Sequence, residues 1–271
     1  MLTFVKFGGS VITNKTKEES PNLPVIKQLA TELRSVWPST TTDRTPQIVL
    51  GHGSGSFGHT YAKRYGVHTG LSSGTDWIGF ALTSAAALRL NRIVVDELLA
   101  VGVPALSLQP SATVCSDNGI LTDWDTTGLS TALEHGLLPV IHGDVAFDTA
   151  QGSAIISTEQ LLTHLVHDPA FQLTRIILVG ESGVYTTDPH LDPHAQRIPH
   201  IDSANIATVL EGAGASHGVD VTGGMRSKIA LMWQLVRTIP NLTIHLIGPT
   251  PKLLPRAIQG DADGEGTLIT A

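Results

Sequence analysis

Glycine stands next to lysine or histidine in three clusters of this 271-residue chain, at residues 6–10, 51–59 and 222–228. Because glycine has no Cβ, its neighbourhood lets backbone N–H groups converge on an anion, and a helix N-terminus adds a favourable partial positive charge. Lysine supplies a mobile positive charge, and histidine supplies one that switches near neutral pH. Each cluster alone also suits a tight turn between a strand and a helix. Together, the three predict a site for a ligand with several phosphates.

Short apolar runs alternate with amphipathic helical patterns along most of the chain. Such alternation predicts an α/β fold, with a central mainly parallel sheet between two layers of helices. The predicted strands are residues 2–7, 47–50, 104–108, 138–142, 175–179, 184–185, 243–247 and 267–270. The predicted helices are residues 22–36, 76–101, 158–167, 203–211 and 224–238, with a hairpin at 144–156 and a loop at 38–42. Residues 168–173 are the best candidate for a lobe boundary, but they are too few for a free linker.

Composition excludes several classes of function. The net charge of −7 leaves no basic field to attract nucleic acid. The single cysteine, Cys115, excludes an internal disulfide and a cysteine zinc cluster, and we expect it to be a small buried side chain. No apolar stretch approaches the ~20 residues needed to cross a bilayer, and no signal peptide is recognised, so we expect a cytoplasmic protein. The histidines form no H-E-x-x-H pair, and Asp192 and His194 are expected in solvent.

Residues 53–58 also match the dinucleotide fingerprint G-x-G-x-x-G, with Asp76 about 20 residues further on, where a ribose-binding acid would stand. That interpretation is weak, because a complete glycine-bearing strand and turn precede the loop. It also leaves Lys6, Lys15 and Lys228 without a role. A Walker A loop and a G-x-S-x-G nucleophile elbow are both absent from the sequence.

The opening Lys6-Phe7-Gly8-Gly9-Ser10, followed by Thr13 and Lys15, resembles the start of the amino acid kinase superfamily. Segments 52–59, 142–148 and 221–228 are similar, more narrowly, to isopentenyl phosphate kinases. Fosfomycin kinases share the histidine at position 59. The resemblance therefore implies a phosphate or phosphonate acceptor rather than a carboxylate.

The resemblance implies an ATP-dependent kinase of isoprenoid biosynthesis that converts isopentenyl phosphate to isopentenyl diphosphate and releases ADP, with Mg²⁺ present. It also implies an amino acid kinase-like α-β-α sandwich that forms a homodimer. The single domain, 1–271, would divide into an acceptor lobe of about 1–170 and a nucleotide lobe of about 171–271. Two alternatives stay open: a kinase for another small phosphate or phosphonate such as fosfomycin, and a non-catalytic nucleotide-binding regulator.

Family roles carry over to individual positions of this chain. Catalysis would fall to Lys6, Lys15 and Asp144, where Asp144 orients a lysine and does not act as a base. The acceptor would be bound by Ser54, His59, Gly143 and Ser157, with help from the amide of Gly55. ATP would be bound by Lys6, Gly8, Gly9, Ser10, Gly55, Gly180, Gly224 and Lys228. The N–H groups of Gly8, Gly9 and Ser10 would cradle the transferring phosphoryl group. No protein ligand for a metal is implied.

Two features of the sequence qualify this assignment. Relatives usually read Thr-Asp-x-Asp-Gly-Val-Tyr where this chain has Val179-Gly180-Glu181-Ser182-Gly183-Val184-Tyr185, so both aspartates are missing although Asp188 and Pro189 fit. Nucleotide preference and metal support are therefore left open. The residues that could form an apolar slot for a five-carbon tail, or simply pack in the core, are Trp77, Ile78, Phe80, Ala81, Ile155 and Ile156.

Overall fold

An eight-stranded sheet runs through the whole molecule. The computed structural model describes residues 2–38, 46–71, 77–187, 189, 191–214, 224–262 and 264–271. The strands lie in the order β12 (His200–Ile201), β14 (Thr267–Ile269), β13 (Thr243–Ile247), β9 (Leu173–Val179), β1 (Leu2–Phe7), β2 (Gln47–His52), β6 (Leu138–His142) and β3 (Ala105–Ser107). All neighbouring pairs are parallel except β13 and β14. Strands from both sides of residue 170 thus belong to one sheet.

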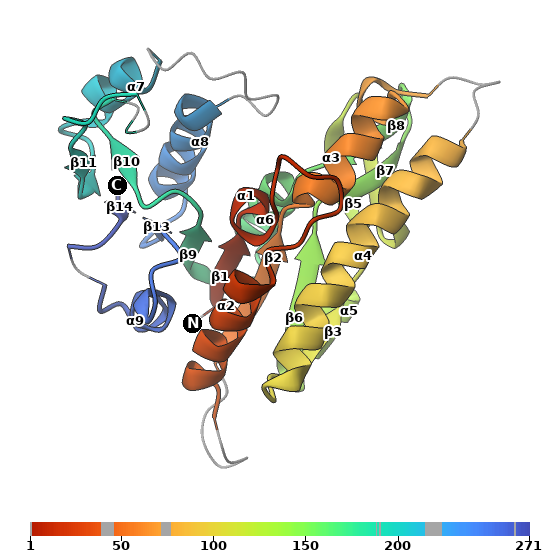
Figure 1. The fold of residues 1–271 in the computed structure, drawn as a ribbon, viewed down its shortest axis with the longest axis horizontal. Helices are drawn as coiled ribbons and strands as arrows, with labels where there is room; N and C mark the ends of the chain where they lie inside the picture. The colour runs from red at the N-terminus through yellow and green to blue at the C-terminus, as the bar shows by residue number, and fades with distance from the viewer. Residues whose placement is uncertain are drawn as a thin grey trace.

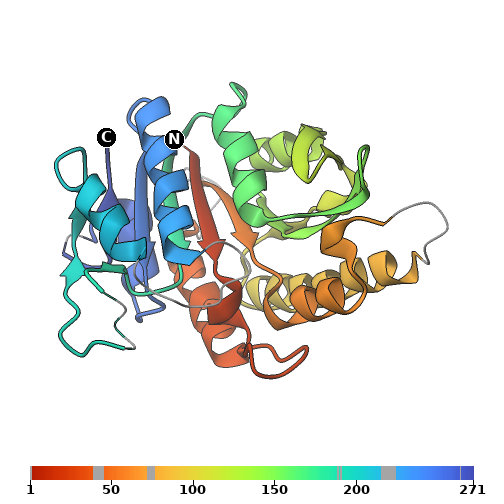
Figure 2. The ribbon, with the colours of Figure 1, turned by 90° about the horizontal axis from the view of Figure 1, so that it is seen from above.

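Helices cover both faces of this sheet (Figures 1 and 2). One face carries α2 (Leu23–Val36), α4 (Ile78–Ala100) and α9 (Leu253–Gln259), and the other carries α5 (Thr127–Glu134), α6 (Thr158–His167), α7 (Ile206–Gly214) and α8 (Gly224–Thr238). Successive side chains of a strand point to opposite faces. In β1, Phe4 therefore packs in the core with α5, α6 and α8, whereas Val5 and Phe7 pack in the core with α2 and α4. The predicted three-layer α-β-α fold is confirmed.

Smaller elements surround the central strands. A four-stranded sheet has the order β5 (Ile120–Trp124), β4 (Val114–Asp117), β7 (Asp144–Asp148) and β8 (Gly152–Ile156), and a two-stranded sheet pairs β10 (Val184–Tyr185) with β11 (Arg197–Ile198). The short helices are α1 (Gly9–Ile12), α3 (Gly55–Arg64), η1 (Val67–Thr69) and η2 (Pro110–Ala112). Figure 2 shows β7 and β8 between α6 on one side and the pair α3 and α4 on the other.

Several sequence predictions can be compared with these elements. The hairpin is confirmed as β7 and β8, and the helix predicted at 158–167 is α6. The helix predicted from residue 76 is seen from Ile78 and ends before Gly102, whose φ of +83° suits a glycine. Most of the predicted loop at 38–42 lies outside the described residues. The burial predicted for Cys115 is wrong, because alternation along β4 turns this side chain to solvent.

Helix α4 also corrects the expectation that no stretch could span a membrane. Among the described residues, it is long and apolar enough by length and composition. One such helix is a weak indication, because buried core helices meet the same criterion. Half of its most apolar window is buried, and Leu90, Val94 and Leu98 pack in the same core as α2 and α9.

Candidate active site

Glycines follow four adjacent strands of the sheet, at the edge where the parallel strands end. Each glycine N–H still donates to the last residue of the neighbouring strand. The four bonds run from Gly143 to His52 (3.1 Å), Gly53 to Phe7 (3.1 Å), Gly8 to Val179 (2.8 Å) and Gly180 to Ile247 (2.8 Å). These amides belong to the sheet and are not available to a phosphate. The expected role of the Gly8 amide in a phosphate cradle is therefore wrong, and the amides of Gly9 and Ser10 remain for it.

The loops after β1 and β2 pack backbone against backbone. A Cβ on Gly9 would lie 2.8 Å from the amide nitrogen of Gly55, and a Cβ on Gly55, whose φ is +48°, would overlap the Thr13 hydroxyl. That hydroxyl donates to Gly9 O (2.6 Å) and accepts from the amide of Ser56 (3.0 Å). Only glycine allows this approach. The two glycine loops are thus held together as one surface.

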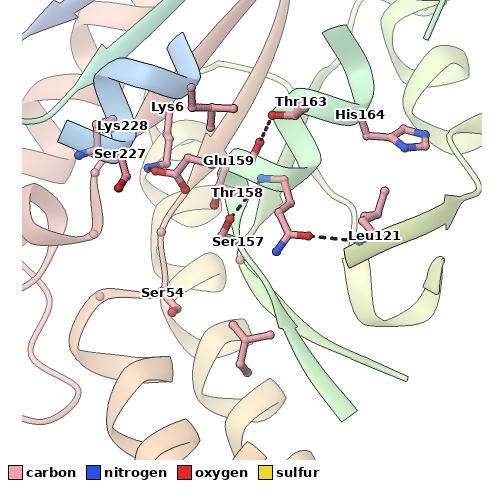
Figure 3. Close-up of a pocket in the computed structure, with 18 of the residues that line it drawn as sticks. Lys6, Ser54, Leu121, Ser157, Thr158, Glu159, Thr163, His164, Ser227 and Lys228 are labelled. Atoms are coloured by element: carbon pink, nitrogen blue, oxygen red, sulfur yellow. Dashed lines mark hydrogen bonds and ion pairs between the residues drawn. The ribbon is translucent and has the colours of Figure 1, made fainter. Parts of the chain in front are cut away.

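This surface borders a cavity of about 910 Å³. The predicted site residues that line it are Lys6, Gly8, Gly9, Ser10, Lys15, Ser54, Gly55, His59, Gly143, Ser157 and Lys228. Gly224 is the first residue of α8, whereas Thr222 and Gly223 lie outside the described residues. In Figure 3, Lys6, Ser227 and Lys228 lie at one end of the cavity, and Leu121 and His164 lie at the other.

An ion pair fixes Lys6 at the end of the cavity that also contains Ser227 and Lys228. Lys6 lies on the face of β1 that packs against α6, and its Nζ is 2.5 Å from Oε1 of Glu159 in the first turn of that helix. The Lys6 side chain is only 12% exposed. Burial acts to raise the pKa of Glu159, but the charges of Lys6 and Lys228 outweigh it and hold the pKa below its ordinary value. The carboxylate therefore stays ionised and fixes the position of Lys6.

Besides the short α1, three longer helices begin at the cavity. Ser54 precedes α3, Ser157 caps α6 by accepting from the amide of Gln160 (3.2 Å), and Ser227 and Lys228 lie in the first turns of α8. The unpaired N–H groups at a helix N-terminus carry partial positive charge. The cavity therefore attracts anions both through backbone dipoles and through lysine side chains.

Two further predicted residues face the cavity from the side of α3. His59 is exposed on the second turn of α3, and Lys15 is exposed in the loop between α1 and α2. Neither is part of the ion pair between Lys6 and Glu159. They add a lysine and a histidine to the lining of the cavity.

The structure gives Asp144 partners other than the expected lysine. Its carboxylate is buried and accepts from the amides of Val145 (2.8 Å) and Ser111 (3.3 Å), and burial raises its pKa. It does not line the cavity, and among the described residues it pairs with no lysine. The prediction that Asp144 orients a lysine is therefore wrong in this structure, because Glu159 holds Lys6 instead.

Glu159 was missed for a reason visible in the sequence. Ser157 with Gln160 three residues later matches the capping-box pattern of a helix start, and an acid in the first turn stabilises any helix through its dipole. A glutamate at position 159 is therefore explained by the helix alone, without a lysine partner. One feature of the sequence points to Glu159: it lies in the first turn of a helix that begins directly after a strand of the predicted hairpin.

Two histidines of the glycine motifs are structural. His52 and His142 end neighbouring strands, are fully buried and stack with ring centroids 5.5 Å apart. Burial lowers the pKa of each ring from 6.5 to about 4, so both are neutral at neutral pH. Their Nδ1 atoms lie 3.1 Å from the carbonyls of Gly53 and Gly143. Within the second glycine cluster, His59 is thus the histidine that lines the cavity.

The apolar slot is only partly present in the cavity. Of the residues predicted for it, Ile155 lines the cavity. Trp77 and Phe80 instead pack with Phe147, with centroids 6.0 and 4.9 Å from the Phe147 ring. Ile156 is buried in the main core. Phe80 belongs to a small buried cluster against which Ile155 packs, but it does not itself line the cavity.

The turn after β9 differs from the predicted nucleotide contact. Gly180 gives its amide to the sheet and does not line the cavity, although a Cβ there would meet no atom within 4 Å. Ser182 is hydrogen-bonded to the Tyr185 hydroxyl (2.7 Å). Asp188 and Asp76 lie outside the described residues, so neither prediction on them is addressed.

Comparison with known proteins agrees with this geometry. The chain is 33% identical to an isopentenyl phosphate kinase of Methanothermobacter thermautotrophicus, with 99% of each chain covered, and 32% identical to one of Haloferax volcanii, with 97% of each covered. A solved structure of an isopentenyl phosphate kinase superposes with a TM-score of 0.80 at 31% identity, covering all of both chains. The family model described as "Amino acid kinase family" matches residues 1–247. The fold is thus shared along the whole chain, which belongs to the amino acid kinase family.

Proposed function

We propose that this protein transfers the γ-phosphoryl group of ATP to isopentenyl phosphate, giving isopentenyl diphosphate and ADP. The observation that carries the proposal is that Lys6, Lys15, His59 and Lys228 line one cavity together with the glycine loops. The relatives described above are isopentenyl phosphate kinases that align over nearly the whole chain, which favours this acceptor over fosfomycin.

The reaction needs no covalent bond between the protein and the transferred group. An oxygen of the acceptor phosphate attacks the γ-phosphorus, the bond to the β–γ bridging oxygen breaks, and ADP leaves with that electron pair. The acceptor oxygen is already ionised, so no general base is needed. What the reaction needs is alignment of two anions and neutralisation of the charge on the transferring group.

The cavity residues suit these needs. We assign Lys6, Lys15 and the amides of Gly9 and Ser10 to the transferring phosphoryl group, because all four residues line the cavity. We assign His59 of α3 and Ser54, which precedes that helix, to the acceptor phosphate. Lys228 on α8 is assigned to the β-phosphate of ATP, where the helix N-terminus also favours negative charge.

The assignment divides the protein into two functional lobes. His59 lies in the proposed acceptor lobe, about 1–170, and Lys228 lies in the proposed nucleotide lobe, about 171–271. Because β1 of one lobe pairs directly with β9 of the other, the central sheet fixes the distance between the two groups of residues. This arrangement supports transfer between two bound anions along the sheet edge.

Magnesium is proposed as a companion of ATP and not as an ion held by the protein. Among the described residues, no group of three or more histidine, cysteine, aspartate or glutamate side chains forms a metal site. Two carboxylates line the cavity: Glu159 is paired with Lys6, and Asp168 accepts a hydrogen bond from the amide of Ala170 (2.9 Å). The donor set therefore does not fit a protein-held ion, and Mg²⁺ commonly keeps water and phosphate ligands.

We further propose a cytoplasmic homodimer. Leu99 on α4 and Leu106 on the edge strand β3 are 47% and 40% exposed, and a second copy would cover such apolar surface. Light scattering of purified protein tests the dimer, and Leu106→Glu should shift it toward monomer. Cell fractionation tests the location.

The decisive experiment measures ADP release with Mg-ATP and a panel of acceptors. The panel contains isopentenyl phosphate, dimethylallyl phosphate, other small alkyl phosphates and fosfomycin. The proposal expects the highest kcat/KM with isopentenyl phosphate. A higher value with fosfomycin would replace the acceptor, and ATP binding without turnover on any acceptor would favour a regulator.

A further inference from the structure

The loop that carries Lys15 is held by backbone hydrogen bonds, both between its two ends and to helix α3. At the base, the amide of Asn14 donates to Ser20 O (2.8 Å), and Asn14 Oδ1 accepts from the amide (3.0 Å) and the hydroxyl (2.8 Å) of Thr16. Lys15 therefore sits inside a turn whose backbone is fixed on both sides. The loop's return arm reaches α3 through the amide of Glu19, which donates to Ser56 O (3.2 Å).

Two neighbouring glutamates of this loop pair with arginines from two different helices. Arg89 of α4 binds both carboxylate oxygens of Glu19, with Nε 2.9 Å from Oε2, and Arg64 of α3 binds Glu18 (2.9 Å). Both guanidinium groups lie over the ring of Tyr61, at 5.2 Å for Arg64 and 6.0 Å for Arg89. The hydrogen bond from Arg89 lowers the pKa of Glu19, so the pair is charged at neutral pH.

The backbone conformation of Glu19 indicates that its tertiary contacts hold it in place. Its φ of +46° is in the left-handed region, which costs energy for any residue with a Cβ and is adopted where surrounding structure enforces it. Glutamate does not favour this conformation by itself, so contacts with the rest of the protein must stabilise it. The bidentate contact with Arg89 and the amide bond to Ser56 are what hold it there.

We propose that Glu18, Glu19, Tyr61, Arg64 and Arg89 form a strap that positions Lys15 for phosphoryl transfer. These five residues are positioning residues, and only Lys15 faces the cavity. The inference rests on the proposed function, since it assumes that Lys15 meets the transferring group. The strap fastens Lys15 to α3, which carries His59, and to α4, so that this cation keeps its place relative to the acceptor phosphate.

The need for such a strap follows from the state of Lys15. It is exposed, and it makes no hydrogen bond or ion pair with any described residue. Lys6, by contrast, is held by Glu159. A lysine with four rotatable bonds on an unfastened loop would sample many positions, and a displacement of about 1 Å at the reacting centre can cost on the order of a hundredfold in rate.

The first test compares two arginines of α4. Arg89→Gln removes the contact with Glu19, whereas Arg92→Gln removes only the surface pair with Asp96 on the same helix. We expect Arg89→Gln to lower kcat on the order of tenfold with little change in KM for ATP or in melting temperature. Arg92→Gln should match the unmodified protein. Equal kcat for both variants would overturn the proposal.

A double-mutant cycle separates positioning of Lys15 from any other effect. If Arg89 acts through Lys15, then Arg89→Gln should cost nothing further in the slow Lys15→Met enzyme, because coupled residues are non-additive. Additive losses would overturn the strap. Glu19→Gly is the second variant, because glycine adopts φ +46° freely and so removes the carboxylate without straining the loop. It should behave as Arg89→Gln does, and full activity in it would contradict the proposal. Absence of turnover in the unmodified protein would instead count against the proposed function.

Discussion

Among single residues, Glu159 does most to define the site. Its carboxylate takes one of the three N–H donors of Lys6 and leaves the others for a phosphate oxygen. It also keeps a negative charge near Lys228, as its lowered pKa shows. A carboxylate among bound phosphates would repel them, so its value lies in orientation: it holds Lys6 where the transferring group passes.

Glu159→Gln should therefore impair transfer more than binding. Glutamine keeps the size and one hydrogen bond but releases Lys6 from its ion pair, and we expect kcat to fall by about ten- to a hundredfold. The KM for ATP should change much less. Steady-state kinetics at saturating acceptor measures this, with the exposed Glu134→Gln as the control. A kcat within twofold of the control would show that Lys6 does not depend on Glu159.

His59 invites a test of a different kind, because its proposed partner is the acceptor alone. His59→Ala should raise KM for isopentenyl phosphate by about tenfold or more, the cost of losing a charge-assisted hydrogen bond. Binding of a non-hydrolysable ATP analogue, followed by calorimetry, should stay near the unmodified value. A parallel loss of nucleotide affinity would mean that His59 faces the donor instead.

Elements place these residues through the ends of adjacent parallel strands. The glycines at positions 8, 53, 143 and 180 each continue the hydrogen-bond ladder by one residue before the chain turns away. The turns are thereby set at one level along the sheet edge. Helices α1 and α3 follow Gly8 and Gly53 directly, and α6 follows the hairpin that begins after Gly143, so the first residues of all three helices can line a common cavity.

The contact between two of these turns predicts a large loss of stability for Gly55→Ala. The new Cβ would overlap Thr13, and alanine at φ +48° is strained even in open space. Together the two effects should lower the free energy of unfolding by about 2–4 kcal/mol. Gly180→Ala is the matched control: it also follows a strand, but its Cβ would meet no atom within 4 Å, so a change within about 0.5 kcal/mol is expected. Urea unfolding measures both, and equal effects would contradict the packing argument.

The elements that sequence predicted well are those with a strong local signal. Helix α6 and the hairpin of β7 and β8 were predicted within a residue, because long apolar periodicity and a glycine turn coincide there. Helix α5, with eight residues, and the mostly exposed β5 carry too little apolar pattern to be recognised. Helix α9 contains Pro255, and a proline argues against a helix when only the sequence is considered. Strand β2 runs on to His52 because it pairs with β6, which is a tertiary effect.

The same distinction holds for the site. Lys6 and His59 are predicted from the glycine clusters in which they stand, whereas the role of Lys15 follows from the resemblance to the amino acid kinase superfamily. Glu159 was not, since its partner lies 153 residues away in the sequence. Which amides point to the cavity was equally hidden: the sheet takes that of Gly8 and leaves those of Gly9 and Ser10, and only strand pairing decides this.

At the scale of the whole molecule, the buried histidine pair couples stability to pH. The native pKa of His52 and of His142 is about 4, whereas an unfolded chain has a value near 6.5. Between pH 6.5 and 4, these two histidines bind protons in the unfolded state but remain neutral in the native state. The free energy of unfolding should therefore fall as pH decreases from 6.5 to 4 and be unaffected by these rings above that range, with up to about 3 kcal/mol lost for each ring.

His142→Phe offers a direct check of this linkage. Phenylalanine fills the place of a ring whose Nε2 has no partner among the described residues, and it cannot be protonated. The variant loses the Nδ1 bond to Gly143, so we expect it to be slightly less stable at pH 7. Its further loss between pH 7 and 4.5 should be clearly smaller than that of the unmodified protein. Urea midpoints at the two pH values measure this, with exposed His135→Gln as the control that keeps the full acid loss. If His142→Phe and His135→Gln lost the same stability on acidification, the acid sensitivity of the fold would have to arise from groups outside the strand-end pair.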